Sequence, residues 1–140
     1  QIPCPFAWTP LYFGDYRAPL DSAHAGKGRF YNCYGGLSFD YFQTNWGVGA
    51  LILPPGTSIG YHRHTLLEEM YIVFSGQGRG TLNDTTVNMG PGDAMLQRVG
   101  GAHGIYNPGP GDLYLLCTGL SIRDDGQMDN ENLMDDLSKR

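Results

Sequence analysis

The chain is poor in charged residues, and in basic residues above all. Of its 140 residues 16% are charged, with nine Lys or Arg against 14 Asp or Glu, a formal net charge of −5. The basic residues are scattered, and only Lys139 and Arg140 adjoin. Because phosphate binding needs clustered Lys and Arg, this composition argues against a nucleic-acid partner. No run of about 18 apolar residues occurs, so no membrane span is expected and the default expectation is a cytoplasmic protein.

Cysteine is also scarce. The three cysteines, Cys4, Cys33 and Cys117, lie far apart and form no CxxC pair, which excludes a zinc ribbon and a thioredoxin-type redox motif. Reduced thiols are expected, and a Cys4–Cys33 disulfide in an oxidising compartment stays open as the alternative.

Turn residues are abundant, with 21 Gly and nine Pro in a chain that is 41% hydrophobic. Between residues 47 and 123 short apolar segments alternate with Gly, Pro and Asn-Asp breakers. We predict strands at 47–53, 58–64, 69–76, 78–82, 86–89, 93–99, 103–107 and 112–122. Short strands at such regular spacing indicate an all-β antiparallel sandwich or small barrel.

The length predicts one domain, residues 1–140, with three regions. Residues 1–46 hold 12 of the 17 aromatic residues and form an N-terminal extension. Residues 47–123 form the barrel, and residues 124–140 form an acidic tail that is either a short helix or disordered. Within the extension, residues 21–28 read as a surface loop with an exposed His24, and a lid residue is the alternative for this histidine.

Two of the four histidines, His62 and His64, sit one residue apart in a predicted strand. Alternate residues of a strand share a face, so both rings point the same way. By itself an HxH pair is more often two histidines on a solvent face. Two imidazoles followed by a carboxylate are, however, what a divalent metal requires of a rigid sheet.

The residues around this pair have a regular spacing. Gly56 is followed by five residues, then His62, His64, Glu69 and Gly76, in the pattern G-x5-H-x-H-x4-E-x6-G. A second stretch runs from Gly92 through Gly100 and His103 to Asn107 and resembles G-x5-P-x-G-x2-H-x3-N. Its one departure is Arg98, where proline is usual, and that substitution puts the path of the loop and the reach of His103 in doubt. On these two motifs the chain resembles the cupin family.

The resemblance implies a double-stranded β-helix, or jelly-roll barrel, with a metal held by His62, His64, Glu69 and His103. One divalent ion per chain is expected, with Fe, Mn, Ni, Co or Zn all suited to three nitrogens and one oxygen. In an octahedral ion two positions stay open for substrate. The short single barrel resembles the small monocupins, which favours dioxygenase-type chemistry. The alternatives are a zinc- or nickel-dependent cyclase, lyase, isomerase or decarboxylase, and a non-catalytic small-molecule binder.

The choice between Glu68 and Glu69 as ligand turns on which face of the strand is inward. If Glu69 points inward, Tyr71 also points inward, and Met70, Ile72 and Phe74 point outward. The outer face of the strand is then the more apolar one, which simple alternation does not favour. The spacing to Gly76 and the resemblance favour Glu69. That apolar outer face would then be covered, by a homodimer partner or by the N-terminal segment.

Two further residues are candidates for catalysis. Tyr71 shares a face with Glu69 and is placed to hydrogen-bond a substrate or move a proton. Gln97 lies on the strand that enters the second motif and could orient a ligand. Asn107 is expected to bond turn backbone, and Arg63 to point away from the metal. The aromatic N-terminal region favours a small aromatic or apolar organic substrate.

Overall fold

The computed structural model describes residues 18–32 and 46–140. All eight predicted strands are confirmed: β3 (Trp46–Leu53), β4 (Ser58–Arg63), β5 (Leu67–Ser75), β6 (Gly78–Leu82), β7 (Thr85–Met89), β8 (Ala94–Gln97), β9 (Ala102–Tyr106) and β10 (Leu113–Ser121). The N-terminal part adds β1 (Ala18–Asp21), the 3-10 turn η1 (Ala23–Ala25) and β2 (Arg29–Asn32). The C-terminal part adds β11 (Glu131–Asn132) and the 3-10 helix η2 (Leu137–Lys139).

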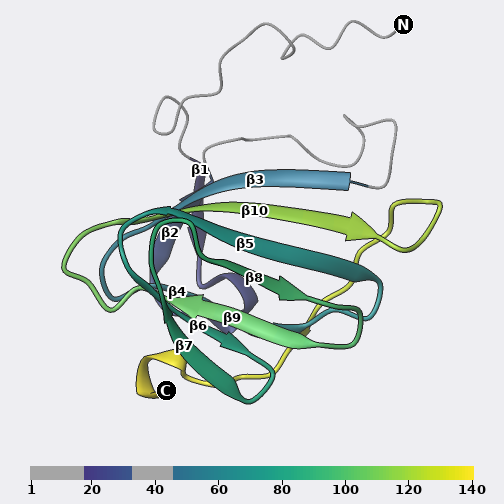
Figure 1. The fold of residues 1–140 in the computed structure, drawn as a ribbon. Helices are drawn as coiled ribbons and strands as arrows, with labels where there is room; N and C mark the ends of the chain where they lie inside the picture. Colours follow the sequence, from purple (N-terminus) through teal and green to yellow (C-terminus); the bar gives the residue numbers. More distant parts are fainter. Residues whose placement is uncertain (1–17, 33–45) are drawn as a thin grey trace, which may run out of the picture.

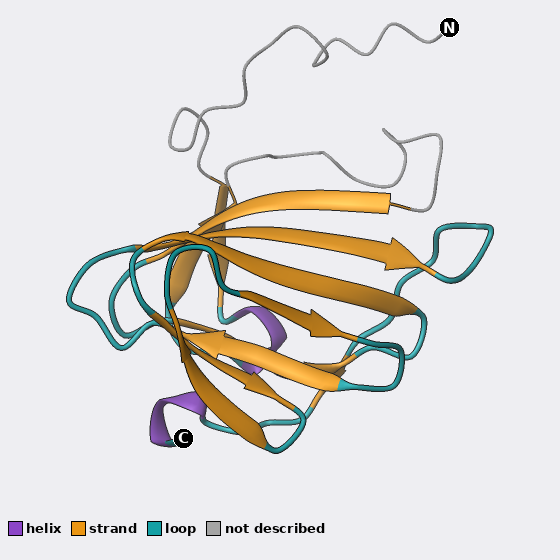
Figure 2. Ribbon diagram, in the orientation of Figure 1, coloured by secondary structure: helices purple, strands orange, loops and turns teal. Residues whose placement is uncertain are grey.

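The strands form two antiparallel sheets that face each other (Figure 1). One sheet has six strands in the order β1-β2-β3-β10-β5-β8, and the other has five in the order β11-β4-β9-β6-β7. From β3 onward the chain passes back and forth between the sheets, and only β6 and β7 form a hairpin of consecutive strands. This is the expected jelly roll, with almost no helix (Figure 2).

Alternation along the strands fills the space between the sheets with apolar side chains. The main cluster includes Leu53, Val73, Ile105, Leu113 and Leu115, which are almost completely buried. Neighbouring residues of the same strands point outward and are more exposed, as the burial pattern of β5 shows. Some polar side chains are buried as well, among them His62, His64, Gln97 and His103.

Gly76, the last residue of the first motif, has a φ of +84°. A Cβ atom at this position would lie 2.4 Å from the carbonyl oxygen of Asp112. The turn after β5 therefore requires glycine both for its left-handed backbone and for its close contact with the chain that enters β10.

Several predictions for the N-terminal extension lie outside the described residues. Cys4 and Cys33 are among them, as are most of the aromatic residues before position 46. Cys117 is a free, partly buried thiol. No helix within residues 18–32 and 46–140 is long and apolar enough to cross a membrane.

Candidate metal centre

Three neighbouring segments bring the four predicted ligands together. His62 on β4 and His103 on β9 are direct cross-strand partners, and His64 follows at the end of β4. Glu69 reaches the same point from β5 of the opposite sheet. One ligand atom from each residue lies within 4.8 Å of all the others. Both histidines of the HxH pair and His103 are buried, so this is an interior cluster and not a solvent face.

The distances within the cluster match a single metal ion. Two atoms each about 2.1 Å from an ion are roughly 3.0 Å apart at a right angle and roughly 4.2 Å apart on opposite sides. The Nε2 atom of His62 lies 3.0 Å from that of His64 and 3.2 Å from that of His103. The Oε2 atom of Glu69 lies 3.0, 3.7 and 4.0 Å from the Nε2 atoms of His103, His64 and His62. The four residues can therefore hold one metal ion.

The outer ring nitrogens show which atoms are free to bind it. Nδ1 of His62 lies 2.8 Å from the carbonyl oxygen of Gly60, and Nδ1 of His64 contacts the carbonyl oxygen of Asp129. A carbonyl oxygen only accepts, so each Nδ1 carries the proton and donates it. In the neutral rings both Nε2 atoms then present lone pairs to each other at 3.0 Å. A cation bound between them would replace this repulsion by coordination.

The protonation preferences of His62 and Glu69 agree with metal binding. Burial lowers the pKa of His62 to about 3, with contributions from the nearby His103 and His24 rings, so this imidazole is neutral at pH 7. Burial opposes ionisation of Glu69, yet its contacts with His103 and His64 hold its pKa well below the usual range. For His64 the Glu69 carboxylate and the Asp129 carbonyl outweigh burial and raise the pKa. Three neutral imidazoles and one carboxylate would leave a divalent ion with a net charge of +1.

The fourth histidine also lies at the cluster, contrary to the expectation of an exposed loop residue. The ring of His24, in η1, stacks on the ring of His62 with centroids 3.8 Å apart and an interplanar angle of 12°. His24 is half-buried, and burial is the main cause that lowers its pKa. The loop that carries it packs on β4, where Ser58 donates its backbone N–H to the carbonyl of Lys27. This long-range packing has no local sequence signal.

Tyr71 and Cys117 lie beside Glu69 on the inner faces of β5 and β10, where they are cross-strand partners. The Tyr71 ring stacks on His103 with centroids 4.6 Å apart, and only 1% of Tyr71 is exposed. Burial, with the Glu69 charge second, raises the pKa of both the Tyr71 phenol and the Cys117 thiol well above their usual values. Both groups therefore keep their protons near neutral pH. Cys117 lies outside both sequence motifs, so its place beside Glu69 was not predicted.

Gln97 is completely buried next to Glu69, its cross-strand partner on β5. Its side-chain amide donates to the carbonyl of Arg98 and, at 3.2 Å, to that of Gly101. Gly100 also donates its backbone N–H to the carbonyl of His64 at 2.7 Å. These bonds hold the loop in which Arg98 replaces the usual proline. His103 reaches the cluster despite that substitution.

Two other expectations are met. Arg63 points away from the metal ligands and pairs with Glu131 at 3.1 Å on the surface. Asn107 is buried and bonds turn backbone: it donates to the carbonyls of Leu53 and Gly111 and accepts from the N–H of Gly109.

A cavity of about 280 Å³ opens onto the cluster at Glu69. Most of the residues that line it are apolar or are glycines, and the apolar ones include Val48, Leu51, Leu67, Cys117 and Met128. A larger hollow of about 540 Å³ lies between β7 and β8 and contains none of the four ligands, so size alone does not locate the site. Of these two cavities, only the smaller is lined by one of the four clustered residues, Glu69.

Comparison with known proteins agrees with this geometry. The chain is 38% identical over 65 residues to an oxalate-binding protein of Thermotoga maritima, a match that spans 46% of this chain and 54% of that protein's length. A crystal structure of a predicted oxalate decarboxylase from the same organism superposes with a TM-score of 0.72 and 27% identity, over 76% of this chain and 92% of that one. An oxalate oxidase in complex with glycolate shares the fold at 14% identity, with a TM-score of 0.54 over 64% of this chain and 46% of that one. The cupin domain model matches residues 49–119, half of the chain, and the chain belongs to the cupin family.

Proposed function

We propose that this cupin is a metal-dependent enzyme that acts on a small organic acid, bound to the metal through its oxygen atoms. The observation that carries the proposal is the cluster of four possible ligand atoms from His62, His64, Glu69 and His103, all within 4.8 Å of one another, beside a cavity that opens at Glu69. A structural metal site is normally closed by its protein ligands. An open cavity at the ligand cluster instead favours a site that exchanges a small molecule.

The cavity suggests the chemical class of the substrate. No Lys or Arg lines it among the described residues, so the metal itself would supply the positive charge that attracts a carboxylate. The apolar walls favour a substrate with a chelating oxygen head and a small apolar remainder. Oxalate, named in relatives of this chain, chelates through its two carboxylates and has no apolar remainder. We therefore propose substituted 2-oxo or 2-hydroxy acids as the preferred class, with oxalate as the reference.

Bound at this site, the metal would act as a Lewis acid on the oxygen atoms of the substrate. The chain's own groups would hold the ligands and the protons around it. We propose that Tyr71, kept neutral and stacked on His103, holds a proton at its phenol oxygen beside Glu69. We propose that Gln97, bonded to the Arg98 and Gly101 carbonyls, acts by fixing the loop that presents His103.

Two reaction classes compete. Dioxygenase-type oxidation is the class expected from the sequence, and the mostly apolar lining of the cavity is compatible with it. Non-oxidative decarboxylation is favoured by the likeness to a predicted oxalate decarboxylase. A redox-active native metal such as iron or manganese would favour the first class, whereas zinc would favour non-redox chemistry.

The test is metal content of protein purified without chelators, in the wild type and in His62→Ala, Glu69→Ala and Glu68→Ala. Glu68 is the matched control because it neighbours Glu69 but is not among the clustered ligands. We expect about one metal per chain in the wild type and in Glu68→Ala, and loss of metal in the other two. Oxygen consumption and carbon dioxide release with oxalate and with 2-oxo acids then separate the two reaction classes. A wild type that stays metal-free after reconstitution would overturn the proposal.

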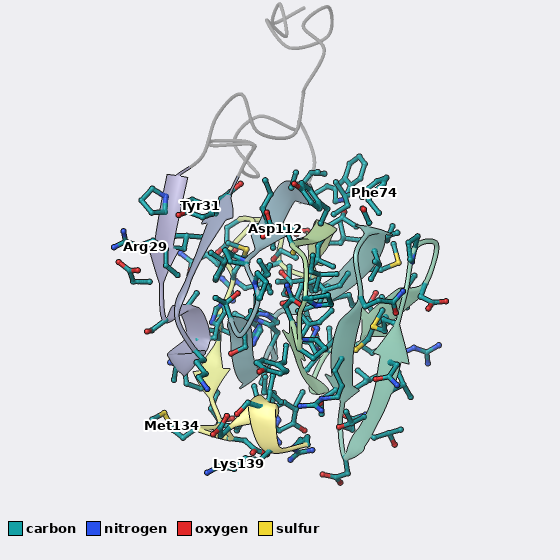
Figure 3. All side chains as sticks on the ribbon, turned by 90° about the vertical axis from the view of Figure 1, so that its left-hand side faces the viewer. Arg29, Tyr31, Phe74, Asp112, Met134 and Lys139 are labelled. Atoms are coloured by element: carbon teal, nitrogen blue, oxygen red, sulfur yellow. The ribbon has the colours of Figure 1, made fainter. Side chains whose placement is uncertain are left out.

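We also propose that the chain forms a homodimer through the outer face of the six-stranded sheet. Leu96 on β8 and Leu120 on β10 are 47% and 48% exposed there, next to the partly buried Met70 and Ile72 of β5. Figure 3 shows Tyr31 and Phe74 on this same side of the molecule, opposite Met134 and Lys139.

A further inference from the structure

The C-terminal segment returns to the strand that carries two of the metal ligands. After β10 the chain crosses to the five-stranded sheet, where β11 pairs with β4 at Arg63 and His62 (Figure 1). Leu133 then donates its backbone N–H to the carbonyl of Tyr61 at 2.9 Å. The segment ends at η2, where Leu137 is 3% exposed and packs with Tyr61. The acidic tail of the sequence is thus an ordered part of the molecule that borders the site.

Asp129 makes the contacts that lie nearest the metal ligands. Its carboxylate accepts from the backbone N–H of Thr65 at 2.9 and 3.0 Å, from the Thr65 hydroxyl at 2.7 Å and from the backbone N–H of Leu66 at 2.8 Å. Its backbone carbonyl accepts from Nδ1 of His64. The side chain of Asp129 therefore anchors the carbonyl that orients a metal ligand.

The three histidine ligands differ in how their rings are held. His62 donates to Gly60, two residues away in the same strand, so its orientation is local. Nδ1 of His103 is buried and has no hydrogen-bond partner among the described residues. Only His64, of the three, depends on a partner 65 residues away. An outer-shell partner of this kind fixes the tautomer and raises ligand basicity, and its loss typically lowers metal affinity about 10- to 100-fold.

We propose that Asp129 is a positioning residue that acts through His64, and that docking of residues 127–132 and metal binding favour each other. The inference rests on the proposed metal site. Linkage requires the effect to be reciprocal, so the bound metal must also hold the segment more firmly. Met128 lies next to Asp129 and lines the cavity at Glu69, so a docked segment also completes the cavity wall.

The test compares Asp129→Ala with Asp124→Ala, using Mn(II) alone as the ligand. Asp124 is the matched control, since it is an exposed acid five residues earlier, whereas the neighbouring Asp125 accepts from the backbone N–H of Gln127 in the docked segment. We expect Asp129→Ala to raise the Mn(II) dissociation constant about 10- to 100-fold and Asp124→Ala to leave it unchanged. Asp129→Asn, which keeps one accepting oxygen, should fall between them and covers the case in which the alanine variant does not fold.

Two readouts separate positioning from a general loss of stability. Hydrogen exchange of residues 127–133 should slow when Mn(II) binds to the wild type, and this protection should be lost in Asp129→Ala. In the metal-free proteins, ¹⁵N shifts of the His64 ring should report Nδ1 protonation in the wild type and a mixture of tautomers in Asp129→Ala. Unchanged Mn(II) affinity in a folded Asp129→Ala protein would overturn the proposal. A wild type that binds no metal contradicts the proposed function instead, and the tautomer readout still decides the role of Asp129.

Discussion

At the scale of single residues, the cluster depends on flat contacts between aromatic rings as well as on its ligands. His62 lies under the ring of His24, and His103 lies against Tyr71. His24 adopts a left-handed backbone with a φ of +53°, a conformation that is uncommon outside glycine. Such a conformation persists only where the surrounding contacts stabilise it. The loop therefore places this ring on the metal ligand at a cost to its own backbone.

We predict that His24→Ala weakens metal binding and that His24→Phe does not. Alanine removes the ring that shields one face of His62, whereas phenylalanine keeps a flat ring in its place. Aromatic pairs contribute about 0.5–1.5 kcal/mol beyond burial, so the dissociation constant of Mn(II) should rise about 2- to 12-fold in the alanine variant. The measurement is a Mn(II) titration, with Lys27→Ala as a control on an exposed side chain of the same loop. An equal loss in the phenylalanine variant would show that a ring nitrogen of His24, and not stacking, supports the site.

At the scale of elements, the loop of residues 21–28 reaches the site because β4 has no side chain where the two cross. A Cβ atom at Gly60 would lie 1.9 Å from the carbonyl oxygen of His24, and one at Gly26 would lie 2.4 Å from that of Ser58. Neither contact can be relieved by turning a side chain, because both partners are backbone atoms. The two glycines thus allow the loop and the strand to pack backbone against backbone.

We predict that Gly60→Ala displaces this loop and destabilises the protein. The added methyl group must push the loop off β4 or bend the strand, and overpacking of this kind typically costs about 1–3 kcal/mol. The measurement is urea unfolding followed by circular dichroism, together with hydrogen exchange of residues 21–28. Gly111→Ala is the matched control, because a Cβ atom there meets nothing within 4 Å and its φ is ordinary. Equal stability of the two variants would contradict the close packing of loop and strand.

The elements that could be predicted from the sequence are those with a local pattern. The strands from β3 to β10 follow from alternation and turn residues, and the four residues able to hold a metal follow from two motifs that resemble those of the cupin family. In β5 the burial of Tyr71 and Val73 beside Glu69 confirms the inward face that spacing favoured over simple alternation. His24 and Asp129 could not be predicted, because each lies in a polar segment and acts through contacts about 40 and 65 residues distant.

At the scale of the whole molecule, the outer face of the six-stranded sheet is covered in one part and exposed in another. On the outer face of the six-stranded sheet Ala50 and Ile52 are covered and pack with Tyr31 and Tyr114. Elsewhere on the same face, Leu96 of β8 and Leu120 of β10 are each about half exposed. A contiguous apolar surface on a sheet is normally covered by another surface. A second copy of the chain is the partner that the homodimer proposal assigns to it.

We predict that the double variant Leu96→Lys/Leu120→Lys is monomeric and that the wild type is a dimer. Two lysines on the proposed interface repel their symmetry mates and remove apolar area from a contact of the size that stable dimers need, about 1,200–2,000 Å² in total. The measurement is sedimentation velocity at several protein concentrations, with circular dichroism to verify the fold. Val87→Lys is the control, because Val87 is 52% exposed but lies on β7 of the other sheet. A monomeric wild type at high concentration would contradict the dimer and would leave the chain's own residues 1–17 and 33–45 as the alternative cover for this face, whereas a dimer that persists in the double variant would place the interface elsewhere.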